Sequence, residues 1–288
     1  MVAYLEERTS PSAVWCQRFA TFTIPYFIIV ILLYRFNKIE TIQMFALIGI
    51  GLIISLISLV LAIRAAVELW NKGYRGGSMV VRGSILSLLV LTPFVYFAFL
   101  ALQFPLANDI TTDAFDPPEY IAAAMYRAER ESQGMNPVMQ YTSEYAREIV
   151  VAYPKLQPRR YPAGPERVLE AVTAIIQENE WPVTGTFGLP DRSAEPVLEE
   201  TESNQAEEAL EDNIAAPDDM YVEFLERTLV FGFENDVVVR IVSEDQNTLV
   251  DVRASSRWGR HDFGYNAKLI ESFLTQLDTA LLGIAGEG

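Results

Sequence analysis

Cysteine and histidine are almost absent from this chain, which contains one of each, Cys16 and His261. Zinc in proteins is held mainly by cysteine sulfur and histidine nitrogen. Cys16 lies at the edge of an apolar N-terminal run and His261 lies in a polar C-terminal segment, so the two cannot assemble a zinc site. The C-terminal part has no cysteine and forms no disulfide bond. We therefore expect neither a metal nor another cofactor.

Familiar enzyme motifs are also missing. The chain has no Rossmann fingerprint, no kinase signature and no P-loop, since GYRGG at residues 73–77 lacks the following Lys-Ser/Thr pair. Ser256, His261 and Asp262 have the residue types of a hydrolase triad, but they lie in one short segment without a G-x-S-x-G elbow. These absences favour a protein that is not an enzyme, although an enzyme remains an alternative.

Positive charge is scarce, and its distribution divides the chain. With 22 Lys/Arg and 38 Asp/Glu the formal charge is −16. Residues 1–105 hold eight basic and four acidic residues, for +4, and the remainder holds fourteen and thirty-four, for −20. A domain at −20 repels a polyanion, so we expect no nucleic-acid partner. Two parts with such different charges belong to different environments.

Three long apolar runs occupy the N-terminal part, at residues 19–34, 44–63 and 84–104. A helix needs about 20 apolar residues to cross about 30 Å of hydrocarbon at 1.5 Å per residue. We therefore predict a three-span membrane anchor over residues 1–105. Charged residues lie only at the span ends or in the loops, which argues against a transporter. Small residues spaced four apart, Gly51 with Ser55 and Gly83 with Ser87, predict close helix packing.

Basic residues in the short loops predict the orientation. Arg64, Lys72, Arg75 and Arg82 lie between the second and third spans with a single Glu68, and such clusters face the cytoplasm. Two basic residues in the other loop give a weaker, opposite signal. We expect a membrane protein with a cytoplasmic N-terminus and a C-terminal domain on the opposite side of the membrane.

The C-terminal part alternates between strand and helix patterns. Residues 106–147 contain Pro117-Pro118 and read as a stalk or linker with a short helix at 120–131. The periodicities predict a domain at residues 148–288, with extended segments at 148–154 and 156–161, helices at 165–180 and 265–282, and strands at 181–187, 220–231, 236–243 and 248–255. Ten carboxylates and no basic residue at 193–219 predict a disordered acidic insertion over residues 190–219. The expected fold is an α+β two-layer domain, an antiparallel sheet with two helices on one face, behind the helical anchor.

Polar residues concentrate in the turn between the last strand and the last helix. Free backbone amides at a helix start favour an anion, so a phosphate, lipid or glycan site is one interpretation. The other is that Asp262 caps the helix, that Gly259 and Gly264 permit the turn, and that the arginines balance an acidic domain. The candidate anion-binding residues are Arg253, Ser256, Arg257, Arg260, His261, Asp262 and Asn266.

Several collinear segments resemble a known family. GFENDVVVR at 232–240, VDVRASSRWGRHDFGYNAKLIESFL at 250–274, DITTDAFDPP at 109–118 and AYPKLQP at 152–158 are similar to signatures of the bacterial domain-of-unknown-function 1499 family. The WNKGYRGG loop and third span, residues 70–104, resemble the membrane anchor of its alphaproteobacterial members. The acidic insertion is longer than the family's usual hairpin. The resemblance implies a membrane-anchored envelope protein of the bacterial inner membrane, with its C-terminal domain in the periplasm, and brings no established activity.

Two function classes remain open. In the first, the domain is a non-catalytic binding or scaffolding module in the cell envelope. Its partners would be the lipid bilayer together with an envelope protein, or a second copy associating through the membrane helices. In the second, the domain is an envelope enzyme or an anionic-ligand binding protein that uses the turn at residues 253–266.

Overall fold

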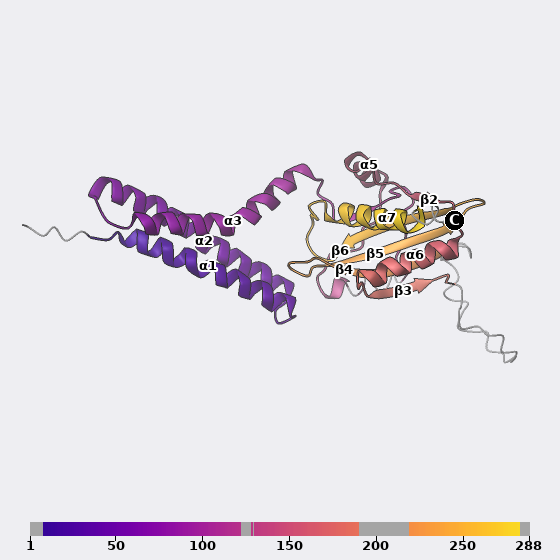
Figure 1. Ribbon diagram of the computed structural model, residues 1–288, viewed down its shortest axis with the longest axis horizontal. Helices are drawn as coiled ribbons and strands as arrows, with labels where there is room; N and C mark the ends of the chain where they lie inside the picture. Colours follow the sequence, from indigo (N-terminus) through magenta and orange to yellow (C-terminus); the bar gives the residue numbers. More distant parts are fainter. Residues whose placement is uncertain (1–7, 122–127, 129, 190–218, 283–288) are drawn as a thin grey trace, which may run out of the picture. The chain divides into compact units, whose positions relative to one another are not determined.

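The structure is a computed structural model that describes residues 8–121, 128, 130–189 and 219–282, and it contains two compact units (Figure 1). The first unit holds residues 1–102, with the N-terminal helices, and residues 229–232. The second holds residues 103–228 and 233–288 and contains the sheet. The predicted acidic insertion, except Asp219, and most of the predicted helix at 120–131 lie outside the described residues.

The first unit consists of three helices, α1 (Pro11–Arg35), α2 (Thr41–Lys72) and α3 (Gly77–Gln103). Each is long and apolar enough to cross a membrane, by length and composition. Each also begins before the corresponding apolar run, because local caps and polar residues extend the helix. Ser10 caps α1 by accepting a hydrogen bond from the Ala13 amide at 3.2 Å, and Gly73 ends α2 in the left-handed conformation.

Small residues line the contacts between these helices. Gly51, Ser55, Gly83 and Ser87 are buried, which confirms the close packing predicted from their spacing. A Cβ atom added at Gly83 would lie only 2.4 Å from the sulfur of Cys16. Glycine is therefore required there for the helices to approach.

The second unit is built on a six-stranded antiparallel sheet in the order β1-β6-β5-β4-β3. β1 and β2 both pair with the outer edge of β6, β1 opposite residues 253–255 and β2 opposite residues 248–250. The strands are β1 (Asp109–Thr111), β2 (Arg159–Tyr161), β3 (Val183–Phe187), β4 (Asp219–Arg227), β5 (Glu234–Ser243) and β6 (Thr248–Ser256). Part of the segment predicted as a stalk thus belongs to the sheet. We call the two ends of the sheet the Ser256 end and the Thr248 end.

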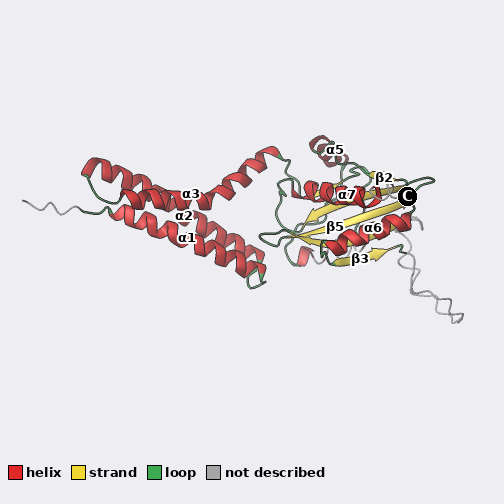
Figure 2. Cartoon of the chain, viewed as in Figure 1, coloured by secondary structure: helices red, strands yellow, loops and turns green. Residues whose placement is uncertain are grey.

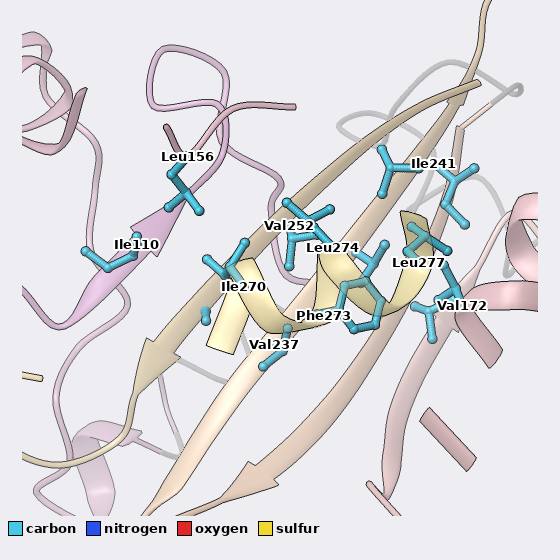
Figure 3. Packing of buried hydrophobic residues seen from close by; sticks show 14 of the residues in the cluster. Ile110, Leu156, Val172, Val237, Ile241, Val252, Ile270, Phe273, Leu274 and Leu277 are labelled. Carbon is cyan, nitrogen blue, oxygen red and sulfur yellow. The ribbon is translucent and has the colours of Figure 1, made fainter. Parts of the chain in front are cut away.

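Three helices, α5 (Ser143–Ala152), α6 (Pro165–Glu178) and α7 (Tyr265–Leu282), contribute to the core on one face of the sheet. Figure 3 shows Ile270, Phe273 and Leu274 of α7 against Val237 and Val252 of the central strands. Val172 of α6 extends the same cluster. The two-layer α+β fold is confirmed, and α7 has the predicted bounds.

The structure contradicts the sequence prediction at residues 148–154. We expected an extended segment, because EIVVAYP is rich in β-branched residues, but residues 148–152 form the second half of α5. Thr142 caps this helix by accepting a hydrogen bond from the Tyr145 amide at 3.2 Å. Ala146 and Ile149, three residues apart, face the core. The helix is amphipathic: within its β-branched run Ile149 is buried in the core, whereas Val150 and Val151 are exposed.

The other face of the sheet is rich in charge. Residues 236, 238 and 240 of β5 alternate with the core-facing Val237, Val239 and Ile241. A second, small apolar cluster on this face joins Val238 to Tyr120 and Val138. The described part of residues 112–142, between β1 and α5, therefore covers part of this face, and we call it the covering segment. Its polar groups contact the charged residues of the sheet.

Candidate functional site

The turn between β6 and α7 is attached at both ends to neighbouring segments. The Arg257 amide donates to the Glu234 carbonyl at 3.0 Å, and the Asp262 amide donates to the Ala107 carbonyl at 2.9 Å. Gly259 and Gly264 have φ values of 86° and 76°, in the left-handed region where glycine is favoured. The turn is therefore held in one conformation beside the start of β1 and the start of β5.

Asp262 caps α7. Its carboxylate oxygens accept hydrogen bonds from the amides of Gly264 at 2.9 Å and Asn266 at 3.1 Å. Burial raises the pKa of Asp262, and these amide hydrogen bonds oppose the rise. The amides at a helix start are the donors that an external anion would use, and here an internal carboxylate occupies two of them.

Arg253 is 3% exposed and forms a two-pronged ion pair with Asp109 of β1, at 2.8 Å from Nε to Oδ1 and 3.0 Å from Nη2 to Oδ2. Its guanidinium also donates to the carbonyls of Pro118 and Met139. The rings of Tyr120 and Tyr141 lie 5.2 and 5.0 Å from it. Burial acts to lower the pKa of Arg253, but the charge of Asp109 raises it above the ordinary value. Arg253 thus joins the sheet to the segment that covers it.

Arg257 belongs to a second cluster of charges. It contacts Glu234 at 2.8 Å and both carboxylate oxygens of Asp236, at 2.9 and 2.7 Å. Arg130, which is 1% exposed, approaches Asp236 from the covering segment and also donates to Ser255 at 3.1 Å. Asp236 is therefore shared by two arginines, and the turn, β5 and the covering segment meet there.

A chain of neutral and acidic groups completes the arrangement. Asn266, fully buried, donates to the Ser256 hydroxyl and to the Asn108 carbonyl, each at 3.0 Å. Ser256 donates to Asn235 at 2.7 Å. The Glu226 carboxylate lies at the end of this chain, where it accepts hydrogen bonds from the Asn235 amide and the Tyr265 hydroxyl, both at 2.7 Å. Burial raises the pKa of Glu226, although both hydrogen bonds act to lower it.

Arg260 and His261 differ from the other candidates. Arg260 is exposed and makes no hydrogen bond or ion pair with any residue that the structure describes. His261 stacks on Phe263, with ring centroids 4.6 Å apart, and its Nδ1 accepts a hydrogen bond from the Phe263 amide. Its Nε2 is buried without a partner among the described residues. The structure thus brings Arg253, Arg257, Ser256, Asp262 and Asn266 into internal networks and leaves Arg260 facing solvent.

Several members of these networks were not among the sequence candidates, namely Asn108, Asp109, Arg130, Glu226, Glu234, Asn235, Asp236 and Tyr265. Asp109 and Asp236 lie in DITTDAFDPP and GFENDVVVR, two of the segments that carried the family resemblance. That resemblance was the signal in the sequence that could have pointed to these two residues. Arg130 carried no signal, because nothing in its local sequence marks it as buried. Its role depends on how the covering segment folds onto the sheet.

The described residues contain no group of three or more metal-ligating side chains. A hollow lined by Gln17, Arg18, Thr21, Phe22 and Pro25 lies on α1 and contains none of the turn residues. These networks place each buried charge of the sheet face next to an opposite charge. The additional hydrogen bonds offset the cost of removing the charged groups from water.

Comparison with known protein families identifies the family of this chain. A family model described as a protein of unknown function, DUF1499, matches residues 109–277. The chain belongs to the DUF1499 family. The match runs from the first residue of β1 into α7 and so includes both partners of the Arg253–Asp109 ion pair. No curated protein and no solved structure matched the chain.

In this DUF1499 protein the three apolar helices precede the matched region. The resemblance of residues 70–104 to an alphaproteobacterial anchor therefore stays a prediction. The family assignment covers the sheet, the candidate turn and most of α7, and the family description carries no activity.

Proposed function

We propose that this DUF1499 protein is a membrane-anchored, non-catalytic module of the bacterial cell envelope. Its C-terminal domain would lie on the periplasmic side of the inner membrane and bind or scaffold another envelope component. The three apolar helices, each long enough to cross a membrane by composition and length, support the anchoring.

The observation that carries the non-catalytic role is the internal pairing of the turn. Arg253 pairs with Asp109, Arg257 with Glu234 and Asp236, and Asp262 with the amides of α7. Groups that bind or transform a substrate need donors or acceptors directed at that substrate. The strongest donors of the turn are instead directed at fixed carboxylates, as expected of a structural junction.

The structural role of the turn can be tested by pairing Arg257→Ala and Asp262→Ala with Arg260→Ala as the matched control, because Arg260 is exposed in the same turn. Each full-length variant would be scored for thermal unfolding in detergent and for complementation of an envelope defect in a deletion strain. We expect the first two to lose stability and complementation together, and Arg260→Ala to keep both. An Arg257 or Asp262 variant that is fully stable yet fails to complement would contradict the proposal.

The predicted orientation rests on basic residues at the connection between α2 and α3, among them Lys72 at the end of α2 and Arg75 in the loop. A reporter enzyme that is active only in the periplasm, fused after residue 104, is expected to be active. A fusion in the loop between α2 and α3 is the control and is expected to be silent. Activity of the loop fusion with silence of the residue 104 fusion would reverse the orientation.

A second candidate function, binding of an anionic ligand such as a phosphate, lipid or glycan at the turn, is favoured by Arg260 alone. Its guanidinium has no partner among the described residues and lies in the turn, five residues before α7 begins. Direct titration of the full-length protein with inorganic phosphate, compared with the Arg260→Ala variant, tests this candidate. Equal binding by both proteins would exclude Arg260 from such a site.

A further inference from the structure

The hairpin loop between β4 and β5 exposes apolar side chains. Its tip reads Leu229-Val230-Phe231-Gly232, and the side chains of Leu229 and Val230 are 85% and 56% exposed. The tip is short and fixed, because the Thr228 amide donates to the Phe233 carbonyl at 2.9 Å and the Phe233 amide donates back to the Thr228 hydroxyl at 2.9 Å. Turns are normally built from Gly, Asn, Asp, Pro and Ser, so the geometry of this loop does not explain its apolar residues.

The hairpin at the Thr248 end of the same sheet provides an internal comparison. β5 and β6 are joined there by Glu244, Asp245, Gln246 and Asn247, all polar. The two loops join consecutive antiparallel strands of similar length, yet one is polar and the other apolar. A single exposed leucine is ordinary on a soluble surface, but an apolar hairpin tip indicates contact with something apolar.

The strand register places the apolar tip at the Ser256 end of the sheet. Asn235 of β5 lies opposite Ser256, and Glu226 of β4 lies opposite Asn235, so the loop that joins β4 to β5 lies at the Ser256 end. Figure 2 shows the strands of the sheet, among them β5, in yellow and the loops in green. The chain also enters the domain at this end, because the Ser256 amide donates to the Asn108 carbonyl at 2.8 Å.

This end of the sheet is tied by a short connection to the last apolar helix. α3 ends at Gln103 and β1 begins at Asp109, so only residues 104–108 join them. At about 3.3–3.6 Å per residue, such a link spans at most about 20 Å. The point where the chain enters the sheet is therefore tethered within about this distance of the end of α3.

Other exposed residues at the same end suit a membrane interface. Leu106, in the connection itself, is 64% exposed. The turn after β6 adds a half-buried Trp258 and the exposed Arg260. Tryptophan is enriched at the lipid headgroup level, and arginine near the surface is attracted to anionic lipid phosphates. The Thr248 end has the opposite character in its hairpin, with Glu244 and Asp245.

We propose that the hairpin tip at Leu229 and Val230 inserts into the lipid interface of the bilayer that α3 crosses, so that the Ser256 end of the domain rests on the membrane. This inference rests on the membrane anchoring in the proposed function and adds a second, reversible contact between the domain and lipid. The occupant of the apolar tip is the bilayer, because the covalent connection keeps the tip near it.

An environment-sensitive fluorophore on a Val230→Cys variant tests the proposal. The full-length chain would be reconstituted in vesicles of phosphatidylethanolamine and phosphatidylglycerol, with or without lipids that carry a nitroxide quencher near the headgroup. The matched control is Gln246→Cys, exposed in the polar hairpin of the same sheet. The wild-type chain, whose Cys16 is 0% exposed, supplies the labelling background.

We expect the Val230→Cys probe to emit at shorter wavelength than the Gln246→Cys probe and to be quenched several-fold more strongly by the nitroxide lipids. Equal, weak quenching at both positions would overturn the proposal. A blue-shifted Val230→Cys probe that the nitroxide lipids do not quench would also overturn it, because the tip would then contact protein, as in association with a second copy.

Two further measurements separate this inference from the proposed function. Alkaline extraction of the membranes reports whether the helices are inserted. A chain that stays in the membrane while the Val230→Cys probe remains unquenched would refute the lipid contact and leave the anchor intact. A chain released by extraction would refute the anchor and the lipid contact together. Unfolding of the labelled variants, expected to match the wild type, verifies that the exposed substitutions preserve the fold.

Discussion

At the scale of single residues, the buried ion pairs of the charged sheet face are costly to break. Taking a guanidinium and a carboxylate out of water costs several kcal/mol per ion, and only close pairing with further hydrogen bonds offsets that cost. Arg253 and Asp109 meet these conditions, since they are 3% and 1% exposed and Arg253 makes two additional hydrogen bonds to backbone carbonyls.

Arg253→Met is therefore expected to destabilise the protein by about 3–5 kcal/mol, because it leaves Asp109 buried and uncompensated. The surface pair of Arg160 and Glu244, whose side chains are 57% and 34% exposed, is the control, and Arg160→Ala is expected to cost about 0–1 kcal/mol. Equilibrium denaturation of the full-length protein in detergent measures both. Similar losses for the two variants would show that the Arg253 pair is not a buried determinant of stability.

Glu226 gives a pH-dependent prediction. Burial raises its pKa above the ordinary 4.5, so the folded protein binds a proton more readily than the unfolded chain does. Protonation then favours folding, and the contribution of Glu226 to stability rises as the pH falls through the raised pKa and levels off below the unfolded value.

In the Glu226→Gln variant this proton uptake is absent. The free energy of unfolding of the wild type minus that of the variant should therefore be flat at high pH and increase on acidification. Denaturation series over a range of pH measure this difference, in which the titration of all other groups cancels. A difference that is constant or decreases as the pH falls would contradict the assignment.

At the scale of elements, the start of α7 depends on a close approach that only glycine permits. Gly264 has a φ of 76°, and a Cβ atom there would lie 2.8 Å from the ring of Phe104. Phe104 in turn stacks on Tyr153 at the end of α5, with ring centroids 6.3 Å apart. Phe104 therefore packs between the residue that follows α5 and the residue that precedes α7.

Gly264→Ala is expected to lose more stability than Gly134→Ala. Gly134 has a similar φ of 69° but nothing within 4 Å of the added Cβ, so it isolates the backbone cost of about 1–2 kcal/mol. The clash with Phe104 should add about 1–3 kcal/mol at Gly264. Unfolding measurements on the two variants make the comparison, and equal losses would mean that Phe104 can move away freely.

At the scale of the whole molecule, the two units have separate means of stabilisation. The main hydrophobic cluster of the second unit draws all its buried members from residues between Ala107 and Leu277. The first unit is held by helix packing with buried serine hydroxyls, such as the 2.8 Å hydrogen bond between Ser87 and Ser58. No residue of α1, α2 or α3 is needed to complete the described core of the domain.

A fragment of residues 103–288 is therefore expected to fold alone and to unfold cooperatively, because it retains the sheet, its covering segment and the helices. The full-length protein in detergent is the comparison, and the two midpoints should agree closely. Denaturation followed by circular dichroism measures this. A fragment without a cooperative transition would show that the membrane helices contribute to the domain's stability.

The sequence by itself determined the features that depend on local patterns. Runs of apolar residues predicted α1, α2 and α3, because crossing hydrocarbon requires length and hydrophobicity. The periodicities of the C-terminal part predicted strands at 236–243 and 248–255 and a helix at 265–282, which correspond to β5, β6 and α7. Small residues such as Gly83 predicted close helix contacts. These patterns can be recognised in the sequence without knowing which segments contact one another in the fold.

Only the tertiary structure decided which polar groups pair. Arg253 and Asp109 are 144 residues apart in sequence, and Arg130 and Asp236 are 106 apart. No local pattern distinguishes a solvated arginine from one that a distant carboxylate will neutralise, because the distinction depends on desolvation, which exists only once the chain is packed. The sequence suggested that these turn residues form an anion site. In the fold, the buried ones interact with other groups of the protein, whereas Arg260 is exposed.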